Sequence, residues 1–304
     1  MVRRYHSNRT APLVGLTVAL FFLPAGAFGQ VRQGCPGGIT LSVGDRTVAQ
    51  GSLLLVEVTS REALPPLASQ WDGHPLPLWK EGEQSLALHG LIGVDLEKPP
   101  GPYEWNISWD DGEGGPRSCS VLLTVRSGKF PTEHLKVEKQ YVQPDVEQQK
   151  RAEEDQRKLR AIYDTVTTER LWNGKFRLPL KESSTGGNFG RRRVLNGEAR
   201  SPHSGVDFPA AAGTPVFASQ GGRVVLAEEL YYAGNTVVID HGYGIYTLYG
   251  HLSKIIRTAG DQVEAGDEIG AVGATGRVTG PHLHWGLTIQ HARVNGLEIV
   301  ERQP

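Results

Sequence analysis

Short runs of apolar, β-branched and aromatic residues, separated by turn residues, dominate the first third of the chain. Residues 103–109 alternate cleanly between the two faces of a strand, and residues 52–58 and 119–125 form similar runs. Asp110-Asp111-Gly112 supplies the turn between two of these runs. The pattern predicts a small β-sandwich over residues 30–127.

The same rhythm returns after Phe176 and continues to the end of the chain. Glycine pairs and Gly-Asp turns separate the apolar runs, and no alternation of strands with helices appears. We therefore expect a second, antiparallel β domain over residues 176–304. Its predicted strands are residues 216–218, 222–227, 236–239, 246–249 and 268–272.

Residues 128–175 have a different composition. A charged run from Pro144 to Lys158 predicts a helix with Pro144 in its first turn. The apolar residues that follow at helical spacing form a face that must pack on something; they are Leu159, Ile162, Tyr163 and Val166. We interpret this segment as a linker with one docked helix, which makes the protein mainly β.

The first 29 residues have the pattern of an export signal. Arg3, Arg4 and Arg9 precede an apolar core at residues 13–23, and small residues follow at 25–29. The core is shorter than the roughly 18 residues of a membrane span. We expect cleavage, no membrane span afterwards, and a location in the periplasm, the cell envelope or outside the cell. The alternative is an uncleaved anchor.

The charge balance argues against nucleic acid as a partner. The formal net charge is −1, and loss of the three arginines of the export signal, which has no acidic residue, changes it to −4.

Cys35 and Cys119 are the only cysteines, and in an exported protein such a pair predicts a disulfide. The long loop it closes would stabilise the first domain by about 4 kcal/mol on the loop-entropy model. With this bridge the sandwich is predicted to be immunoglobulin-like. It has no titratable cluster, so we interpret it as a binding, spacing or inhibitory module open to a regulatory protein partner.

Candidate chemistry begins with His282 and His284, which would point to the same face of a strand with roughly 6.6 Å between them. Upstream, His203 and Asp207 would lie about 13 Å apart on a straight strand, too far to share an ion. The chain must therefore curl, and Gly205 is placed to allow it. His203 and Asp207 could then bind one cation, with His282 or His284 as the third ligand. Three ligands and an open position are typical of catalytic zinc.

Three further histidines lie nearby in the sequence. His251 ends an apolar strand that should lie beside the strand of His282, whereas His241 and His291 are expected in turns or on the surface. Two histidines and one carboxylate also make the facial triad of non-haem iron oxygenases. That triad usually has its histidine and acid one residue apart, so the spacing here favours hydrolysis.

Several short motifs follow one another between Phe176 and Val300, in the order in which they occur in a known protein family. They are Asn188-Phe189-Gly190, His203-Ser204-Gly205-Val206-Asp207, Gly213-Thr214-Pro215-Val216, Tyr249-Gly250-His251-Leu252-Ser253 and residues 275–285, which end in His282-Leu283-His284-Trp285. Together they resemble the lysostaphin/LytM-type zinc metallopeptidases. One departure is Asn295-Gly296, where a proline often follows the asparagine.

The resemblance implies specific roles. His203, Asp207 and His284 would bind one zinc ion per chain, and His251 and His282 would be unligated catalytic imidazoles. The substrates would be peptide bonds in peptidoglycan stem peptides or cross-bridges. Judged by residue type and not by the resemblance, Arg191, Arg192 and Arg193 could bind muropeptide carboxylates or form a solvated basic turn.

Two questions stay open at this point. Some relatives have lost metal ligands and only activate cell-wall amidases, which is the alternative to an enzyme; here all five positions are filled. The bond cleaved is undetermined, although a D-alanyl–diaminopimelate cross-link fits a periplasmic enzyme better than a glycine bridge. Whether the first domain or the helix near residues 144–166 covers the site and keeps the enzyme latent is a further question that the sequence leaves open.

Overall fold

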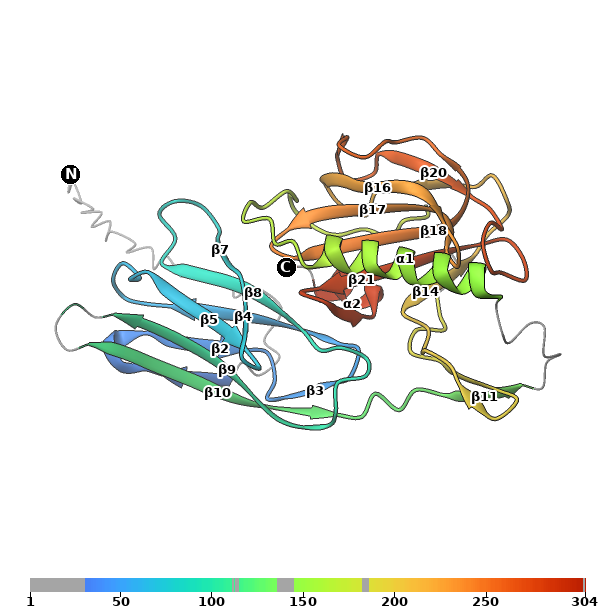
Figure 1. Cartoon of the computed structure of the whole chain (residues 1–304). Coiled ribbons are helices and arrows are strands. Elements are labelled where there is room, and N and C mark those ends of the chain that lie inside the picture. Colours follow the sequence, from blue (N-terminus) through green and yellow to red (C-terminus); the bar gives the residue numbers. More distant parts are fainter. Residues whose placement is uncertain (1–30, 111, 113–114, 136–144, 182–185, 303) are drawn as a thin grey trace, which may run out of the picture.

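The computed structural model describes residues 31–110, 112, 115–135, 145–181, 186–302 and 304. The predicted export signal lies outside these residues. The chain is mainly β, as predicted, and consists of two β-rich halves with helix α1 (Val146–Tyr163) lying across one of them (Figure 1). Neither helix among the described residues has the length and apolar character needed to cross a membrane.

The first half is a sandwich of two five-stranded sheets. One has the order β1 (Val31–Gly34), β2 (Thr40–Val43), β4 (Leu53–Thr59), β8 (Ala87–Gly93) and β7 (Leu78–Lys80). The other has the order β3 (Thr47–Ala49), β10 (Pro116–Arg126), β9 (Gly101–Asp110), β5 (Leu67–Trp71) and β6 (His74–Pro75). Leu41, Val56, Trp105 and Leu123 pack together between the sheets. The predicted disulfide between Cys35 and Cys119 is present.

Helix α1 follows the sandwich and packs against the second half. Asp145 caps it by accepting a hydrogen bond from the Gln148 amide, while the Gln148 side chain bonds back to Asp145. The helix therefore begins at Val146. Pro144, which was predicted in its first turn, lies outside the described residues. Leu159, Ile162 and Tyr163 pack on the sheet as predicted, whereas Val166 lies beyond the helix and is exposed.

The second half is built on one antiparallel sheet. Its central order is β14 (Gly205–Pro209), β21 (His282–Ile289), β18 (Ile245–Ile255), β17 (Gly234–Gly242), β16 (Gly222–Leu230) and β19 (Gln262–Val263). Two outer strands, β15 (Pro215–Phe217) and β20 (Glu268–Val272), pair with each other, and β20 also pairs with β18. β22 (Ala292–Val294) pairs with β21 and leads into α2 (Gly296–Arg302). The expected antiparallel architecture is confirmed.

A small sheet joins the two halves. β11 (Thr132–Leu135) pairs in parallel with β12 (Arg192–Leu195), which pairs with β13 (Glu198–Ala199). Phe130, just before β11, packs edge-on against Phe189. The segment that carries Asn188 and Phe189 is therefore held between the sandwich and the second half.

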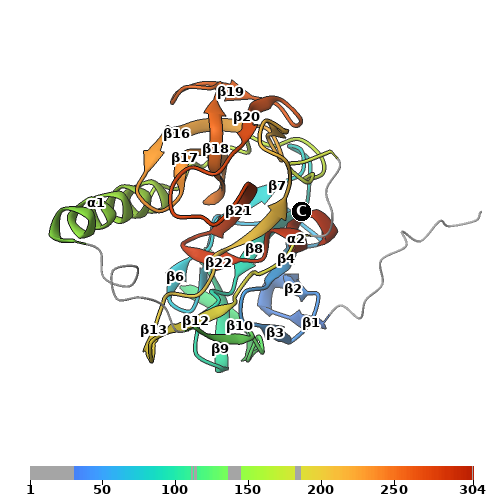
Figure 2. The same cartoon turned by 90° about the vertical axis from the view of Figure 1, so that its right-hand side faces the viewer.

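The two halves also share a hydrophobic core. Leu53, Trp79 and Leu91 of the sandwich pack into the cluster that contains Phe176 and Trp285. In Figure 2, β22 and α2 lie against β4 and β8 of the sandwich. The sandwich is thus packed directly onto the second half.

Ion pairs of Arg293 and hydrogen bonds to Glu298 also link the two halves. Arg293 donates from Nη2 to Asp95 at 2.7 Å and to Glu97 at 2.8 Å. Glu298 accepts hydrogen bonds from the Ser52 hydroxyl at 2.7 Å and from the Leu53 amide at 3.1 Å.

One expectation for a histidine is wrong. His241 does not lie in a turn or on the surface: it is fully buried on β17. Its Nδ1 lies 2.6 Å from the Gly221 carbonyl oxygen and its Nε2 lies 2.7 Å from the Thr247 hydroxyl. Burial lowers the pKa of His241 to about 4. His291, in contrast, is exposed in the turn before β22, as expected.

Candidate metal centre

The centre is built on the pairing of β14 with β21. On β21, Leu283 and Trp285 are buried in the core, so His282 and His284 share the opposite, partly exposed face. Asp207 on β14 lies directly opposite His284 in the antiparallel register. Directly opposed side chains are about 5 Å apart at Cβ, so their functional groups can meet.

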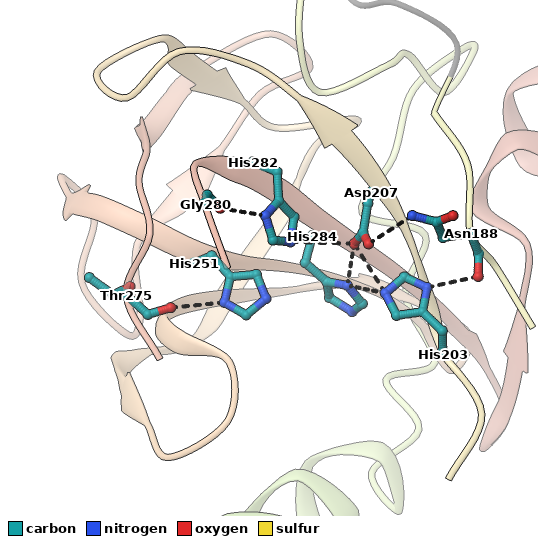
Figure 3. Close-up of polar contacts among 8 residues, drawn as sticks. All are labelled: Asn188, His203, Asp207, His251, Thr275, Gly280, His282 and His284. Atoms are coloured by element: carbon teal, nitrogen blue, oxygen red, sulfur yellow. Dashed lines mark hydrogen bonds and ion pairs between the residues drawn. The ribbon is translucent and has the colours of Figure 1, made fainter. Parts of the chain in front are cut away.

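His203 joins this pair from the segment before β14. The chain curls there as expected, because the His203 amide donates to the Arg191 carbonyl at 3.0 Å and the Gly190 amide donates to the His203 carbonyl at 2.8 Å. These bonds place the imidazole of His203 against Asp207 and His284 (Figure 3).

Three potential metal ligands converge at this point. The distances are 3.0 Å from His203 Nε2 to Asp207 Oδ1, 3.1 Å from His284 Nδ1 to Asp207 Oδ1, and 3.1 Å from His203 Nε2 to His284 Nδ1. The three side chains are only 14–20% exposed. Of the described residues, these alone form a group of three or more histidine, cysteine or acidic side chains close enough to share an ion.

The donor set and its spacing fit zinc. Neighbouring ligands at the tetrahedral angle and at zinc bond lengths of about 2.0–2.1 Å lie about 3.3 Å apart, close to the three distances above. The Nδ1 of His203 lies 3.1 Å from the Asn188 carbonyl oxygen, which can only accept. Nδ1 of neutral His203 therefore carries the hydrogen, and Nε2 presents a lone pair toward Asp207.

His251 and His282 lie beside this triangle with their ring orientation fixed in the same way. His251 Nδ1 is 2.9 Å from the Thr275 carbonyl oxygen, and His282 Nδ1 is 2.9 Å from the Gly280 carbonyl oxygen. Each neutral ring therefore has its free lone pair on Nε2. The two ring centroids are 4.8 Å apart, and His282 Nε2 lies 3.7 Å from Asp207 Oδ1.

His251 occupies the point where β18 changes its neighbour. Up to Gly250 the strand pairs with β21, and from Leu252 it pairs with β20. The prediction that the strands of His251 and His282 lie side by side is thus confirmed. His251 itself has φ = 62°, a conformation that non-glycine residues rarely adopt.

Burial and neighbouring charges tune the site. Burial alone would raise the pKa of Asp207, but the His203 and His284 rings beside its carboxyl group hold that pKa well below its usual value, so the group is a carboxylate. Burial, followed by the effect of His284, lowers the pKa of His251 to about 4. Burial also lowers the pKa of His284. Neutral imidazoles around one carboxylate make a site suited to a divalent cation.

The three predicted substrate-binding arginines lie on or just before β12. Arg191 Nη1 is 3.7 Å from Glu133 Oε2. Arg192 is exposed, and its amide donates to the Pro131 carbonyl at 2.9 Å. The side chain of Arg193 lies outside the described part of the chain. Arg191 takes part in the site through its backbone carbonyl, which holds His203.

Three backbone carbonyl groups that take part in the site could not be predicted from the sequence. Those of Asn188, Thr275 and Gly280 set the ring orientation of His203, His251 and His282. All three residues lie inside the motifs quoted above, but a backbone carbonyl has no side-chain signature. Asn188, at φ = 72°, also places its Nδ2 3.4 Å from Asp207 Oδ2.

Comparison with known proteins gives a consistent picture. Residues 201–296 match the model of peptidase family M23. The peptidoglycan DD-endopeptidase ShyA of Vibrio cholerae is 47% identical over 112 residues, which are 36% of this chain and 26% of ShyA. The catalytic domain of the antimicrobial peptidase lysostaphin from Staphylococcus simulans is 35% identical; the match covers 39% of this chain and 78% of that one, with a TM-score of 0.29.

A further solved structure is similar over both halves. It is a Pseudomonas aeruginosa protein assigned to peptidase M23, 28% identical, with a TM-score of 0.59. The match covers 83% of this chain and 94% of that chain. By contrast, the chain spans only about a quarter of the length of the curated relatives it matches.

Proposed function

Since the chain belongs to peptidase family M23, we propose that it is an exported zinc endopeptidase that hydrolyses peptide cross-links of peptidoglycan. The single observation that carries this proposal is the convergence of His203, Asp207 and His284 within 3.0–3.1 Å of one another, with two further imidazoles beside them.

In this proposal His203 Nε2, Asp207 Oδ1 and His284 Nδ1 bind one zinc ion. Zinc in such a site supplies a Lewis acid and lowers the pKa of a bound water from 15.7 to about 7. The carbonyl of Asn188 holds the His203 ring so that its lone pair is available, which is the usual supporting contact of a zinc-bound histidine.

His251 and His282 handle the protons. With a pKa near 4, the His251 imidazole is neutral at physiological pH, so its Nε2 can accept a proton from the attacking water. His282 Nε2 lies on the same side of the site and can hold a proton, stabilise the developing oxyanion and protonate the departing amine. Both rings keep Nδ1 on a carbonyl oxygen, so neither needs to turn during the reaction.

The relatives support peptidoglycan as the proposed substrate. ShyA, which is 47% identical over 112 residues, is named a peptidoglycan DD-endopeptidase. We propose the D-alanyl–diaminopimelate cross-link as the bond cleaved. Arg191, Arg192 and Arg193 are proposed to bind carboxylates of the muropeptide. Arg192 is more accessible than Arg191, which is paired with Glu133.

The proposed organisation is an export signal at 1–29, a sandwich at 30–127, a linker with one helix at 128–175 and the peptidase domain at 176–304. An envelope or extracellular location would give the enzyme access to its substrate and allow the disulfide to form. The sandwich would offer its outer surface to a regulatory protein partner.

The proposal is tested by measuring zinc content and digesting purified cross-linked muropeptide dimers. We expect one zinc ion per chain and a new free amine on diaminopimelate, with cleavage lost on chelation and restored by zinc. Absence of both zinc and new amine would contradict an enzyme and favour an amidase-activating role. Zinc binding without cleavage of this dimer would call for a glycine-bridged substrate.

A further inference from the structure

The proposed chemistry needs the His251 imidazole in one orientation, and the structure contains a device that fixes it. We propose that Thr275 and Asn235 are positioning residues that clamp His251 beside the metal centre. This inference rests on the proposed function and extends it to two residues that are not among the proposed metal ligands.

The backbone of His251 is in a conformation that must be held. Its φ of 62° lies in the left-handed region, at the residue where β18 leaves β21 and turns to β20. Such a conformation costs free energy in a histidine and persists only where neighbouring groups fix it. One of these groups is the Ala233 carbonyl, which accepts the His251 amide at 2.7 Å.

Thr275 holds both the ring and the backbone. Its carbonyl accepts from His251 Nδ1 at 2.9 Å, and its hydroxyl donates at 2.8 Å to the carbonyl of Leu252, the next residue along the strand. The same hydroxyl accepts from the Asn235 amide at 2.9 Å. Thr275 therefore joins the imidazole, the bend of β18 and the turn that begins β17.

Asn235 completes the clamp from the other side. Its Nδ2 donates to the Leu252 carbonyl at 3.0 Å, so this carbonyl accepts two side-chain hydrogen bonds. The bend at His251 is thus fixed on both sides, by the Ala233 carbonyl before it and by Thr275 and Asn235 after it.

The two loops that carry these residues are in direct backbone contact. A Cβ atom at Gly234, whose φ is 62°, would lie 2.3 Å from Thr275 Oγ1. A Cβ atom at Gly276, whose φ is 75°, would lie 2.4 Å from the Gly234 nitrogen. This close approach packs the segment of Thr275 directly against the start of β17, which supports the position of its carbonyl beside His251.

The clamp determines where His251 Nε2 lies relative to His282 and Asp207. Without the Thr275 hydroxyl, the loop loses its bond to Leu252 and the His251 ring can rotate or shift. A displacement of about 1 Å at a reacting group can cost about 100-fold in rate. The proposed metal ligands lie on β14, on β21 and in the segment before β14, so metal binding should survive.

The test compares Thr275→Val, Thr275→Ser and Asn235→Ala with Thr214→Val. Thr214 donates its hydroxyl to the Ala211 carbonyl at 2.7 Å before β15, so it matches the chemistry of Thr275 away from His251. We expect Thr275→Val to lower kcat about 10- to 100-fold with KM and zinc content unchanged. Asn235→Ala should lower kcat less, Thr275→Ser should restore it to within about threefold, and Thr214→Val should leave it unchanged.

Two further measurements separate positioning from general damage. In a His251→Ala background, Thr275→Val should cause no additional loss, because both act through the same imidazole. Long-range ¹H–¹⁵N spectra of the full chain should show the His251 Nδ1–H signal in the wild type and its shift or broadening in Thr275→Val. Asn235→Ala keeps Thr275 in place and tests the clamp if Thr275→Val does not fold.

The inference is overturned if Thr275→Val keeps wild-type kcat and an unchanged His251 signal, or if Thr214→Val causes an equal loss. Full activity of His251→Ala would instead contradict the proposed role of His251. If the wild type cleaves no muropeptide, the proposed function fails while the spectra still report on the clamp.

Discussion

Gly205 lies against the imidazole of His284 so closely that a Cβ atom there would be 2.6 Å from both Cε1 and Nε2 of the ring. It would also lie 2.8 Å from the Trp285 carbonyl oxygen. Gly205→Ala should therefore push the His284 ring out of its position and weaken zinc binding at least about tenfold, because a ligand off its geometry loses the coordinate bond. Chelator competition measures this affinity.

Gly187→Ala is the matched control, since a Cβ atom at Gly187 would have nothing within 4 Å. It should keep wild-type zinc affinity. Equal affinity in both variants, with both folded by circular dichroism, would show that the contact between Gly205 and His284 does not matter for the metal.

The reason for a glycine at position 205 could not be predicted from the sequence. The spacing of His203 and Asp207 correctly required a curl, and Gly205 was expected to allow it. Instead, Gly205 is the first residue of β14, outside the left-handed region, and the curl is held by backbone bonds to Gly190 and Arg191. The reason for glycine is the approach of a ring from β21, and a contact between residues 79 positions apart leaves no local pattern.

The assignment of His284 to the metal and His282 to proton transfer predicts that two similar variants behave differently. His284→Ala removes an atom of the ligand triangle, so zinc and activity should be lost together. His282→Ala should keep zinc and lose at least about 100-fold in kcat, a typical effect of removing a general acid or base. Zinc analysis and muropeptide assays on the same preparations measure both quantities.

Circular dichroism should show that both variants are folded. Equal zinc content in the two would contradict the assignment, and loss of zinc from His282→Ala alone would reverse it.

His241 predicts how stability depends on pH. Its pKa of about 4 in the folded state is below the value of about 6.5 in the unfolded chain, so between these values the unfolded state binds more protons. The free energy of unfolding should therefore fall as pH drops from 6.5 to 4, by about 3 kcal/mol from this residue at 1.36 kcal/mol per pKa unit. Urea unfolding at several pH values measures the slope.

His241→Asn provides the comparison. It should be less stable than the wild type at pH 7.5, because it loses the bonds to Gly221 and Thr247. The difference between the two proteins should shrink as pH falls toward 4, since the variant has no imidazole at this position to charge. A constant difference across this range would contradict the buried, neutral state of His241.

The strands could be predicted from the sequence, but the burial of His241 could not, and the reason is physical. Apolar runs such as residues 236–239 and 268–272 report burial along the chain itself, and these runs lie on strands. Asp240-His241-Gly242 has the composition of a turn, but β17 continues through it. What keeps His241 inside is a pair of hydrogen bonds to Gly221 and Thr247, which lie 20 and 6 positions away, and the sequence does not display such partners. The ring orientation of His203, His251 and His282 depends in the same way on carbonyl groups of other segments.

The contact between Arg293 and Asp95 predicts that the two halves unfold together. Arg293 donates from Nε and Nη2 to the two carboxylate oxygens of Asp95, a bidentate pair with side chains 33% and 26% exposed. These bonds raise the pKa of Arg293. Burial alone would raise the pKa of Asp95, but the bonds from Arg293 hold it below its usual value. Arg293→Ala should leave Asp95 partly buried without this partner and lower the free energy of unfolding by about 1–3 kcal/mol.

Lys158→Ala is the matched control, because Lys158 pairs with Glu228 where both side chains are 43–48% exposed, and such surface pairs contribute about 0.2–1 kcal/mol.

Arg293→Ala should also separate the single unfolding transition into two. The reason is that Arg293 links the sandwich to the β21–β22 hairpin, at the edge of the shared core of Leu53, Trp79 and Leu91. Differential scanning calorimetry resolves the transitions. A single transition with unchanged midpoint in Arg293→Ala would show that the shared apolar core alone holds the halves together. A rise in muropeptide cleavage in the same variant would indicate that the fixed sandwich restrains the enzyme, whereas an unchanged rate would remove latency through this interface.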